Sequence, residues 1–515
     1  MKLSLALLAE PVLAGARRLF WLSTWLLWIP MGVYIVALNR GHHLGLLQGA
    51  LLVVSAIGLV VINIETTVVV YSCRRPYPWH HRGMVQRWGQ ALRSWCLGFS
   101  PRTDRARTRA GAAISGPSPS WVEPPSTASP STVLPLVSIV VAAYLPNEQD
   151  IIEDTLIHWL TQVTPPAQGW EIILAYNTPT PLPVERRLRA LAYRHPALVL
   201  LPVDHSHSKA ENLNAALQMV RGEMTGIFDA DHHPAPDCLG RAWAWLYQGR
   251  YDVVQGRNII RNAQDSWLTQ LIAVEFECIY GVSHYGRSLL ADTALFGGSN
   301  GYWRTTALRQ LGFHHTRLTE DIDTTVRGLL GGCRLVHDPA IVTTELAPDN
   351  LRGLWLQRQR WSQGWLEVAG LYLGRVLRSP HLDAAQKPYW ALMLLFSQGF
   401  YPLVWQVVPM LLSIYISDRD RDLNFETLNL VLMGLLTLSV VLQVAVAMVL
   451  RPEASTYTRR HGLLYCLLSP VYFWLKALIG MVALVNHLSG SRVWHVTART
   501  KRKPRKWMPA LRGVK

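Results

Sequence analysis

Long apolar stretches lie near both ends of the chain and are missing from its middle. They cover residues 19–38, 44–71, 389–416, 428–450 and 463–485. A helix needs about twenty apolar residues to cross the roughly 30 Å hydrocarbon layer of a bilayer, so the pattern predicts membrane-spanning helices. Pro470 and Lys476 interrupt the last stretch, and proline disrupts a helix by removing a donor and clashing with the preceding turn. We therefore expect four spans, with the last stretch bending back or lying along the membrane surface.

Between the two apolar regions, the chain alternates strand-like and helix-like segments. The β-branched or apolar runs at 137–144, 170–175, 198–203 and 224–228 predict strands. Segments with helical periodicity separate them, and this order predicts an α/β domain with a mostly parallel sheet and helices on both faces. Such sheets bind their ligands at the carboxyl ends of the strands, which is where we expect the functional residues.

The two patterns together divide the chain into six segments. They are an N-terminal transmembrane hairpin (1–75), a basic interfacial helix with a Pro- and Ser-rich linker (76–134), a cytosolic α/β domain (135–350), amphipathic interface helices (351–388), C-terminal transmembrane and interfacial helices (389–487) and a basic cytosolic tail (488–515). The cytosolic side follows from nine Arg and one Asp between Cys73 and Arg109, because basic loops stay inside. We expect an integral protein of the plasma (inner) membrane, with both termini in the cytoplasm.

Composition narrows the classes of protein that the chain can belong to. Half of the 515 residues are hydrophobic and only 16% are charged, which excludes a disordered chain. Six scattered Cys with no CxxC pair exclude a disulfide scaffold and argue against a structural zinc site. The net charge of +16 comes partly from basic residues beside the apolar stretches. We assign that charge to the anionic surface of a lipid bilayer rather than to nucleic acid.

Acidic residues are grouped at two places in the α/β segment. Asp229 and Asp231 flank one residue just after the fourth predicted strand. Two such carboxylates can share Mg²⁺ or Mn²⁺, which take oxygen ligands; the alternative is a polar turn that caps the next helix. Thr319, Glu320 and Asp321 form the second group. They could supply a catalytic base or simply form a helix N-terminus, where a capping Thr and acids are favoured.

A third group combines aromatic and basic side chains. Gln357, Arg360 and Trp361 share one face of an amphipathic helical segment. A Trp ring can stack on the apolar face of a sugar, and Arg can pair with a diphosphate. In isolation, an interfacial Trp/Arg helix explains the same pattern. The small-residue stretch 296–301 precedes this segment and lets a ligand approach the backbone closely.

Four motifs occur in a fixed order between the predicted spans: DxD at 229–231, FxGS at 296–299, TED at 319–321 and QxxRW at 357–361. In this order the chain resembles the membrane-embedded family 2 glycosyltransferases, which include cellulose, chitin and hyaluronan synthases. The resemblance covers about residues 135–365 and the flanking spans. It implies a GT-A-like catalytic domain inserted in an α-helical transmembrane bundle.

The resemblance also implies which residues bind a nucleotide sugar. They are Tyr144, Glu148, Asn177, Lys209, Asn212, Asp229, Thr497 and Arg499. Lys209 and Asn212 belong to a KAxNLN stretch, and Thr497 and Arg499 to a tail segment similar to the gating loop of cellulose synthases. At Asn177 the chain departs from the family, which usually has an Asp-rich turn there that contacts the nucleobase. An amide can still hydrogen-bond a base, but the departure weakens the expectation of a uridine donor.

The predicted activity is processive, inverting and metal-dependent transfer from a nucleotide-diphosphate sugar, with UDP-glucose favoured, to a β-linked, cellulose-like glucan that leaves through the protein's own channel. The expected roles are cation binding by Asp229 and Asp231, proton abstraction by Asp321 with Glu320 and Thr319 shaping the site, and acceptor binding by Trp361, Gln357 and Arg360. The expected partners are the donor, the growing polysaccharide, the bilayer and a second copy or accessory export subunit, without nucleic acid. The alternatives are a chitin- or hyaluronan-type synthase, a non-processive enzyme that adds one sugar to a lipid or glycan, a non-catalytic relative and a transporter of unrelated mechanism.

Overall fold

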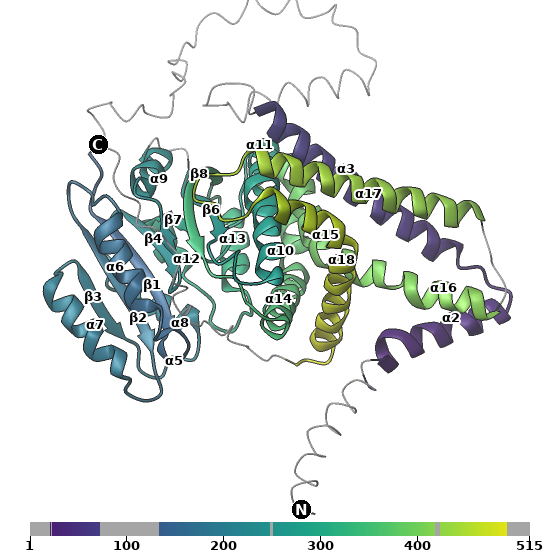
Figure 1. Cartoon of the computed structure of the whole chain (residues 1–515), viewed down its shortest axis with the longest axis horizontal. Helices are drawn as coiled ribbons and strands as arrows, with labels where there is room; N and C mark the ends of the chain where they lie inside the picture. Colours follow the sequence, from purple (N-terminus) through teal and green to yellow (C-terminus); the bar gives the residue numbers. More distant parts are fainter. Residues whose placement is uncertain (1–20, 22, 73–132, 248–250, 418–422, 492–515) are drawn as a thin grey trace, which may run out of the picture.

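The computed structural model describes residues 21, 23–72, 133–247, 251–417 and 423–491. Within them, an α/β domain lies beside a group of long helices drawn from both ends of the chain (Figure 1). The predicted interfacial helix with most of its linker and the predicted gating-loop segment lie outside the described residues.

Eight strands in the described part of the chain form one sheet, in the order β3-β2-β1-β4-β7-β6-β8-β5. They are β1 (Val137–Tyr144), β2 (Trp170–Asn177), β3 (Leu198–Pro202), β4 (Met224–Asp229), β5 (His233–Pro234), β6 (Val253–Ile260), β7 (Gly301–Arg304) and β8 (Leu335–Glu345). The first four strands run parallel to one another, as the sequence predicts. The α/β class is therefore confirmed, and the antiparallel strands β7 and β5 make the sheet a mixed one.

Helices cover both faces of this sheet. They are α5 (Leu145–Glu148), α6 (Ile152–Gln162), α7 (Pro183–Arg194), α8 (Lys209–Leu217), α9 (Cys238–Tyr247), α10 (Trp267–Phe276), the π-helical η3 (Glu277–Ser283), α11 (His284–Ala291), α12 (Thr305–Leu311) and α13 (Glu320–Leu330). Successive residues of β1 enter opposite cores, since Ile139 packs with residues of α6, α7 and α9, and Val140 with residues of α8, α12 and α13. A strand buried on both faces explains why this run reads as continuously apolar.

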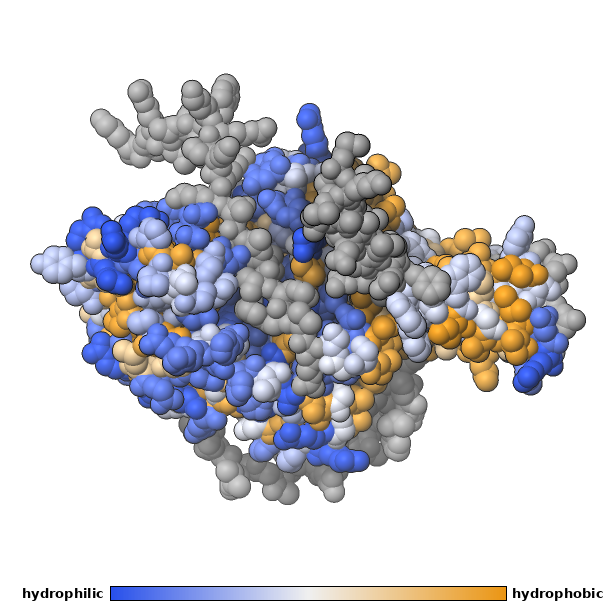
Figure 2. Space-filling model, turned by 90° about the horizontal axis from the view of Figure 1, so that it is seen from below, coloured by the Kyte–Doolittle hydropathy of each residue, from blue (hydrophilic) through white to orange (hydrophobic). Residues whose placement is uncertain are grey.

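The long helices flank the α/β domain in the sequence. They are η1 (Thr24–Trp28), α2 (Ile29–Asn39) and α3 (Gly45–Ser72) before it, and α14 (Leu351–Arg378), α15 (Gln386–Trp405), α16 (Val407–Ser417), α17 (Leu423–Val449) and α18 (Arg459–Leu488) after it. Figure 1 shows α3 lying along α17, and α2 along α16, in an arm that extends away from the sheet. Apolar residues are prominent over this arm, whereas hydrophilic residues dominate the visible α/β surface (Figure 2).

Four described helices are long and apolar enough to cross a membrane: 45–72, 399–417, 427–449 and 459–488. The number matches the predicted four spans, but the four helices are not the same stretches: the last apolar stretch is included and the first is not. Pro470 lies inside the continuous helix α18, so the expectation that this stretch bends back is wrong, and by length and composition the helix qualifies as a span. The alternative, that the stretch lies along the membrane surface, stays a prediction. A proline within an apolar helix is tolerated where neighbouring helices satisfy the freed backbone group. The first predicted span contributes only a shorter apolar helix, Thr24–Asn39, to the described residues.

One ion pair joins the first long span to the α/β domain. Glu65 of α3 is 2% exposed, and its Oε1 lies 2.8 Å from Nε of Arg287 on α11. The Cα of Gly286 is packed so closely against Glu65 that an added Cβ would meet its backbone at 2.8 Å. A charge on an otherwise apolar helix is thus paired with the domain rather than left in lipid.

We expect Trp159→Ala to destabilise the α/β domain strongly. Trp159 of α6 is fully buried, and its ring lies 4.8 Å from the ring of Phe228 on β4. Removing a buried indole costs about 3–5 kcal/mol of folding free energy, through lost burial and the cavity left behind. The check is the melting temperature of the full chain in detergent. Tyr193→Ala on α7, at a side chain that is 91% exposed, is the control and should leave that temperature nearly unchanged.

Candidate active site

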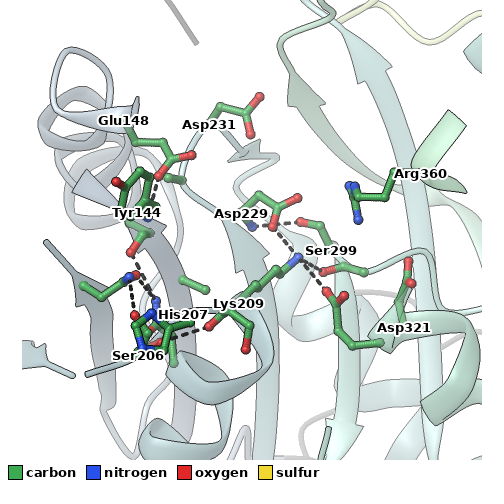
Figure 3. A pocket seen from close by; sticks show the side chains of 18 of the residues that line it. Tyr144, Glu148, Ser206, His207, Lys209, Asp229, Asp231, Ser299, Asp321 and Arg360 are labelled. Atoms are coloured by element: carbon green, nitrogen blue, oxygen red, sulfur yellow. Dashed lines mark hydrogen bonds and ion pairs between the residues drawn. The ribbon is translucent and has the colours of Figure 1, made fainter. Parts of the chain in front are cut away.

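A cavity of about 910 Å³ opens at the carboxyl ends of β1, β2 and β4, the edge where open α/β sheets bind their ligands. Most of the predicted site residues line it: Tyr144, Glu148, Asn177, Lys209, Asn212, Asp229, Asp231, Glu320, Asp321, Gln357, Arg360 and Trp361. Figure 3 shows several of them around one space. Thr319 does not line the cavity, and Thr497 and Arg499 lie outside the described residues.

Lys209 connects the two acidic groups. Ser208 caps α8 and so fixes Lys209 in the first turn of that helix. The ammonium group pairs with Asp229, lies 3.8 Å from Glu320 Oε1 and donates a 2.7 Å hydrogen bond to the carbonyl of Gly298 (Figure 3). Burial alone would lower the pKa of Lys209, but the charges of Asp229 and Glu320 outweigh it and raise the pKa. The side chain is therefore a fixed positive charge inside the cavity wall.

Asp321 occupies the first turn of α13 and faces the loop that precedes β7. Its Oδ1 accepts a 2.9 Å hydrogen bond from the backbone N–H of Ile322. Desolvation raises the pKa of Asp321 to about 7, and the charge of Glu320 adds to this, while Lys209 and the Ile322 N–H act in the opposite direction. A carboxyl group whose pKa lies near neutrality can exchange a proton at physiological pH, which a catalytic base requires.

Thr319 has a structural position rather than a place on the cavity wall. It is 2% exposed at the N-terminus of α13, and its Oγ1 has no hydrogen-bond partner among the described residues. The capping hydrogen bond that this hydroxyl would accept from a backbone N–H of the first turn is therefore absent there. The side chain instead packs so tightly against Gly364 of α14 that a Cβ at Gly364 would clash with it. Thr319 thus fits the TED segment against the QxxRW helix.

Asp229, Asp231 and His232 form a candidate metal site. One ligand atom from each of the three lies within 4.8 Å of the others. Asp231 Oδ1 lies 3.4 Å from His232 Nδ1, and Asp231 Oδ2 accepts a 2.9 Å hydrogen bond from the backbone N–H of Leu346, which fixes the carboxylate. Two carboxylates and an imidazole suit a small divalent cation such as Mg²⁺ or Mn²⁺. His232 was not among the predicted ligands, although it directly follows the DxD motif.

The QxxRW residues form another wall of the cavity. They lie on α14, where Asn350 caps the helix by accepting a 2.8 Å hydrogen bond from the backbone N–H of Gly353. Arg360 Nη1 donates to the carbonyl of Leu318 at 3.1 Å, so the motif contacts the residue before the TED segment. Gln357 Oε1 and Arg360 Nε have no hydrogen-bond partners within the described ranges. Buried polar atoms of this kind usually have partners. Since both side chains line the cavity, a molecule bound there is a candidate partner for these atoms.

At the end of the cavity opposite the QxxRW residues, Asn177 is the last residue of β2 and takes part in a network of amide hydrogen bonds. Asn212 Nδ2 donates to Asn177 Oδ1 at 2.9 Å, and Asn177 Nδ2 donates to the carbonyl of Ser206 at 2.9 Å. The segment 204–208, just after β3, also lines the cavity but was not predicted. The rule that ligands bind at strand ends applies to it equally, and would have found it.

The fold and cavity define a class of protein: an α/β domain with a mixed sheet that carries acidic groups around a cavity at its strand ends. The model of the glycosyl transferase family group 2 matches residues 226–479, and that of glycosyl transferase family 2 matches residues 138–312. The chain therefore carries family 2 glycosyltransferase domains, as the resemblance implied.

Curated relatives match parts of the chain. A glucomannan 4-beta-mannosyltransferase 7 of Arabidopsis thaliana is 30% identical over 32% of this chain and 30% of its own length. A cellulose synthase catalytic subunit of Xanthomonas axonopodis is 30% identical over 34% of this chain and 25% of its own length. A beta-monoglucosyldiacylglycerol synthase of Trichormus variabilis is 28% identical over 56% of this chain and 61% of its own length. The chain spans about a third of the length of the first curated relatives it matches.

Solved structures of glycosyltransferases are also similar to the chain. The mannosyltransferase PcManGT from Pyrobaculum calidifontis, solved with GDP-Man and Mn²⁺, aligns with 84% of this chain and 100% of its own. The sequence identity is 18% and the TM-score 0.49.

We expect Gly298→Ala to reduce glycosyl transfer by more than about tenfold. Gly298 has φ +83°, and an added Cβ would lie 2.9 Å from Asp321 Oδ2. The substitution strains the backbone and displaces the carboxylate, and a displacement of even 1 Å can cost about a hundredfold in rate. The check is the initial transfer rate at saturating donor. Gly374→Ala, at a helical position on α14 with open space around it, is the control, and equal losses in both variants would contradict the prediction.

Proposed function

We propose that the protein is a processive, inverting glycosyltransferase that builds a β-linked, cellulose-like glucan from a nucleotide-diphosphate sugar, with UDP-glucose the favoured donor. One observation carries the proposal: a single cavity holds the DxD acids, Asp321 and Trp361, beside helices long enough to cross a membrane. Relatives named as a glucomannan 4-beta-mannosyltransferase and a cellulose synthase catalytic subunit support the β-glycan product.

In this proposal, the donor lies along the strand ends. Its base contacts Asn177 and Asn212, whose amides form the network beside Ser206. Tyr144 and Glu148, which line the same end of the cavity, contact the nucleotide, and Thr497 and Arg499 cover it. Lys209 pairs with the diphosphate.

The diphosphate end of the donor meets the candidate metal site. Asp229 and Asp231 hold a Mg²⁺ or Mn²⁺ ion there, with His232 beside them. When bound, this cation neutralises charge that develops on the diphosphate as it leaves.

Asp321 then removes the proton from an acceptor hydroxyl. The hydroxyl oxygen attacks the anomeric carbon from the side opposite the diphosphate, the bond from that carbon to the diphosphate oxygen breaks, and the nucleoside diphosphate leaves. One displacement inverts the configuration, so an α-linked donor gives a β-linkage. Burial raises the pKa of Asp321, and the negative charge of Glu320 adds to this. Thr319 holds the segment against α14.

The acceptor lies at the α14 end of the cavity. The Trp361 ring stacks on its terminal sugar, and the unpartnered atoms of Gln357 and Arg360 hydrogen-bond it. The catalytic domain faces the cytoplasm, where nucleotide sugars are made, with both termini on that side of the plasma membrane. The growing chain leaves along the membrane helices, either through this copy or with a second copy or an accessory export subunit.

A second candidate is a non-processive enzyme that adds one sugar to a lipid. The beta-monoglucosyldiacylglycerol synthase favours it, since that alignment covers 56% of this chain. The four described helices that are long and apolar enough to cross a membrane would also leave only a narrow channel for a polysaccharide.

Asp321→Asn should abolish transfer and spare nucleotide binding. An amide keeps the size of the side chain but cannot take a proton, and loss of a general base costs about 10²–10⁴-fold in rate. Because desolvation raises the pKa of Asp321 to about 7, the wild-type kcat/KM should fall below that pH, where the base is protonated, and level off above it. UDP binding by calorimetry should be unchanged. Asp237→Asn, at an exposed carboxylate, is the control; a fully active Asp321→Asn enzyme contradicts the assignment.

Product length distinguishes the two candidates. We expect detergent-purified protein with Mg²⁺ or Mn²⁺ to incorporate radiolabelled glucose from UDP-glucose into material that is long on a sizing gel and digested by a β-glucanase. EDTA should stop the reaction. GDP-mannose and UDP-N-acetylglucosamine serve as comparison donors. A labelled product that stays a single sugar on lipid supports the second candidate, and no transfer from any donor contradicts both.

A further inference from the structure

Arg358 belongs to the QxxRW segment but does not line the cavity. It is 9% exposed, and its Nη2 donates a 2.6 Å hydrogen bond to Glu275 Oε2 of α10. Its guanidinium carbon lies 4.3 Å from the centre of the Trp361 ring. A guanidinium stacked on an indole attracts the ring electrostatically, and here it backs the aromatic side chain that lines the cavity.

Glu275 is the centre of this buried cluster. Besides Arg358, its carboxylate accepts hydrogen bonds from Tyr472 Oη at 2.7 Å and Lys476 Nζ at 3.2 Å, both on the membrane helix α18. Burial alone would raise the pKa of Glu275, but the charges of Arg358 and Lys476 outweigh burial and lower it. The carboxylate is therefore ionised and holds three donors at once. The next residue, Phe276, lines the cavity, and the centre of its ring lies 5.6 Å from the Arg358 guanidinium carbon. The cluster around Glu275 therefore lies directly behind the cavity wall.

The position of this cluster has a geometric consequence. A buried charge cluster stabilises a fold poorly compared with apolar packing of the same volume, whereas charged hydrogen bonds fix direction well. Here a hydrogen bond from α18 fixes the Glu275 carboxylate, and the carboxylate fixes the Arg358 guanidinium. The guanidinium in turn lies against the Trp361 ring. The orientation of the ring thus depends on a carboxylate that does not itself reach the cavity.

We propose that Glu275 is a positioning residue for the acceptor site: it orients Arg358, which sets the plane of Trp361, and it ties that plane to the membrane helix α18. This inference rests on the proposed role of Trp361 in binding the acceptor. Loss of the Glu275 charge would free Arg358 to reorient and Trp361 to tilt. Acceptor binding would weaken, while the donor end of the cavity, which touches none of these residues, would be unaffected.

The experiment uses Glu275→Gln in the full chain in detergent, with UDP-glucose as donor and a cello-oligosaccharide as acceptor. Transfer to the oligosaccharide and hydrolysis of UDP-glucose by water are measured separately. We expect the acceptor KM to rise roughly tenfold, the scale of one lost coupling between neighbouring side chains, with the donor KM and the hydrolysis rate unchanged. Arg358→Lys, which keeps the positive charge but loses the planar group, should give the same selective rise.

The matched control is Glu277→Gln. Glu277 lies two residues further along, is fully buried and pairs with Arg257, but it contacts neither Trp361 nor α18 through any hydrogen bond in the described part of the chain. It should leave the acceptor KM unchanged. If Glu275→Gln and Arg358→Lys lower transfer and hydrolysis in parallel, the cluster is only structural and the inference is overturned.

Trp361→Ala separates this inference from the function on which it rests. If Trp361→Ala raises the acceptor KM and Glu275→Gln does not, the positioning role alone is wrong. If Trp361→Ala has no effect on the acceptor KM, or the wild type does not use the oligosaccharide at all, the proposed acceptor site fails and the positioning role with it.

Discussion

The ammonium of Lys209 is the interaction on which the candidate site depends. It joins three segments that are distant in the sequence: its own helix α8, the end of β4 at Asp229, and the TED helix at Glu320. Ionised carboxylates brought together in a partly desolvated space repel one another strongly. A fixed cation between them lets the strand end and the helix approach, and so creates one cavity from two acidic motifs. The left-handed turn at Gly298, whose carbonyl also binds Lys209, completes the contact.

The rest of the cavity carries an excess of negative charge that this one ammonium does not balance. Its acidic lining residues are Glu148, Asp204, Asp229, Asp231, Glu320, Asp321 and Glu345, against Lys209 and Arg360. Such a wall repels a bare diphosphate, and it raises the pKa of Asp321, where burial acts first and the neighbouring carboxylate second. Both effects agree with the proposed chemistry, in which a divalent cation accompanies the donor and a carboxyl group with a near-neutral pKa serves as the base.

The α/β domain is joined to the long helices by buried charges as well as by apolar packing. Glu65 of α3 pairs with Arg287, and Glu275 pairs with Arg358 and with Lys476 of α18. Apolar contacts allow helices to slide and rotate at small cost, whereas a charged hydrogen bond is satisfied in only one arrangement. The paired residues therefore fix how the α/β domain packs against the long helices.

The sequence by itself determined the elements and the kind of chemistry. Apolar length predicted membrane helices, period and β-branching predicted the four parallel strands, and the rule of strand ends led to Asp229 and Asp231, because these properties are local. Asn177 and Lys209 came from the resemblance to family 2 glycosyltransferases, which rests on motifs in the sequence. Tertiary structure alone decided that α18 continues through Pro470, that Thr319 packs against Gly364 instead of capping, and that His232 joins the two aspartates. It also turned Arg358 toward Glu275. Each of these depends on which distant side chain lies opposite, and a spacing along one chain carries no information about that.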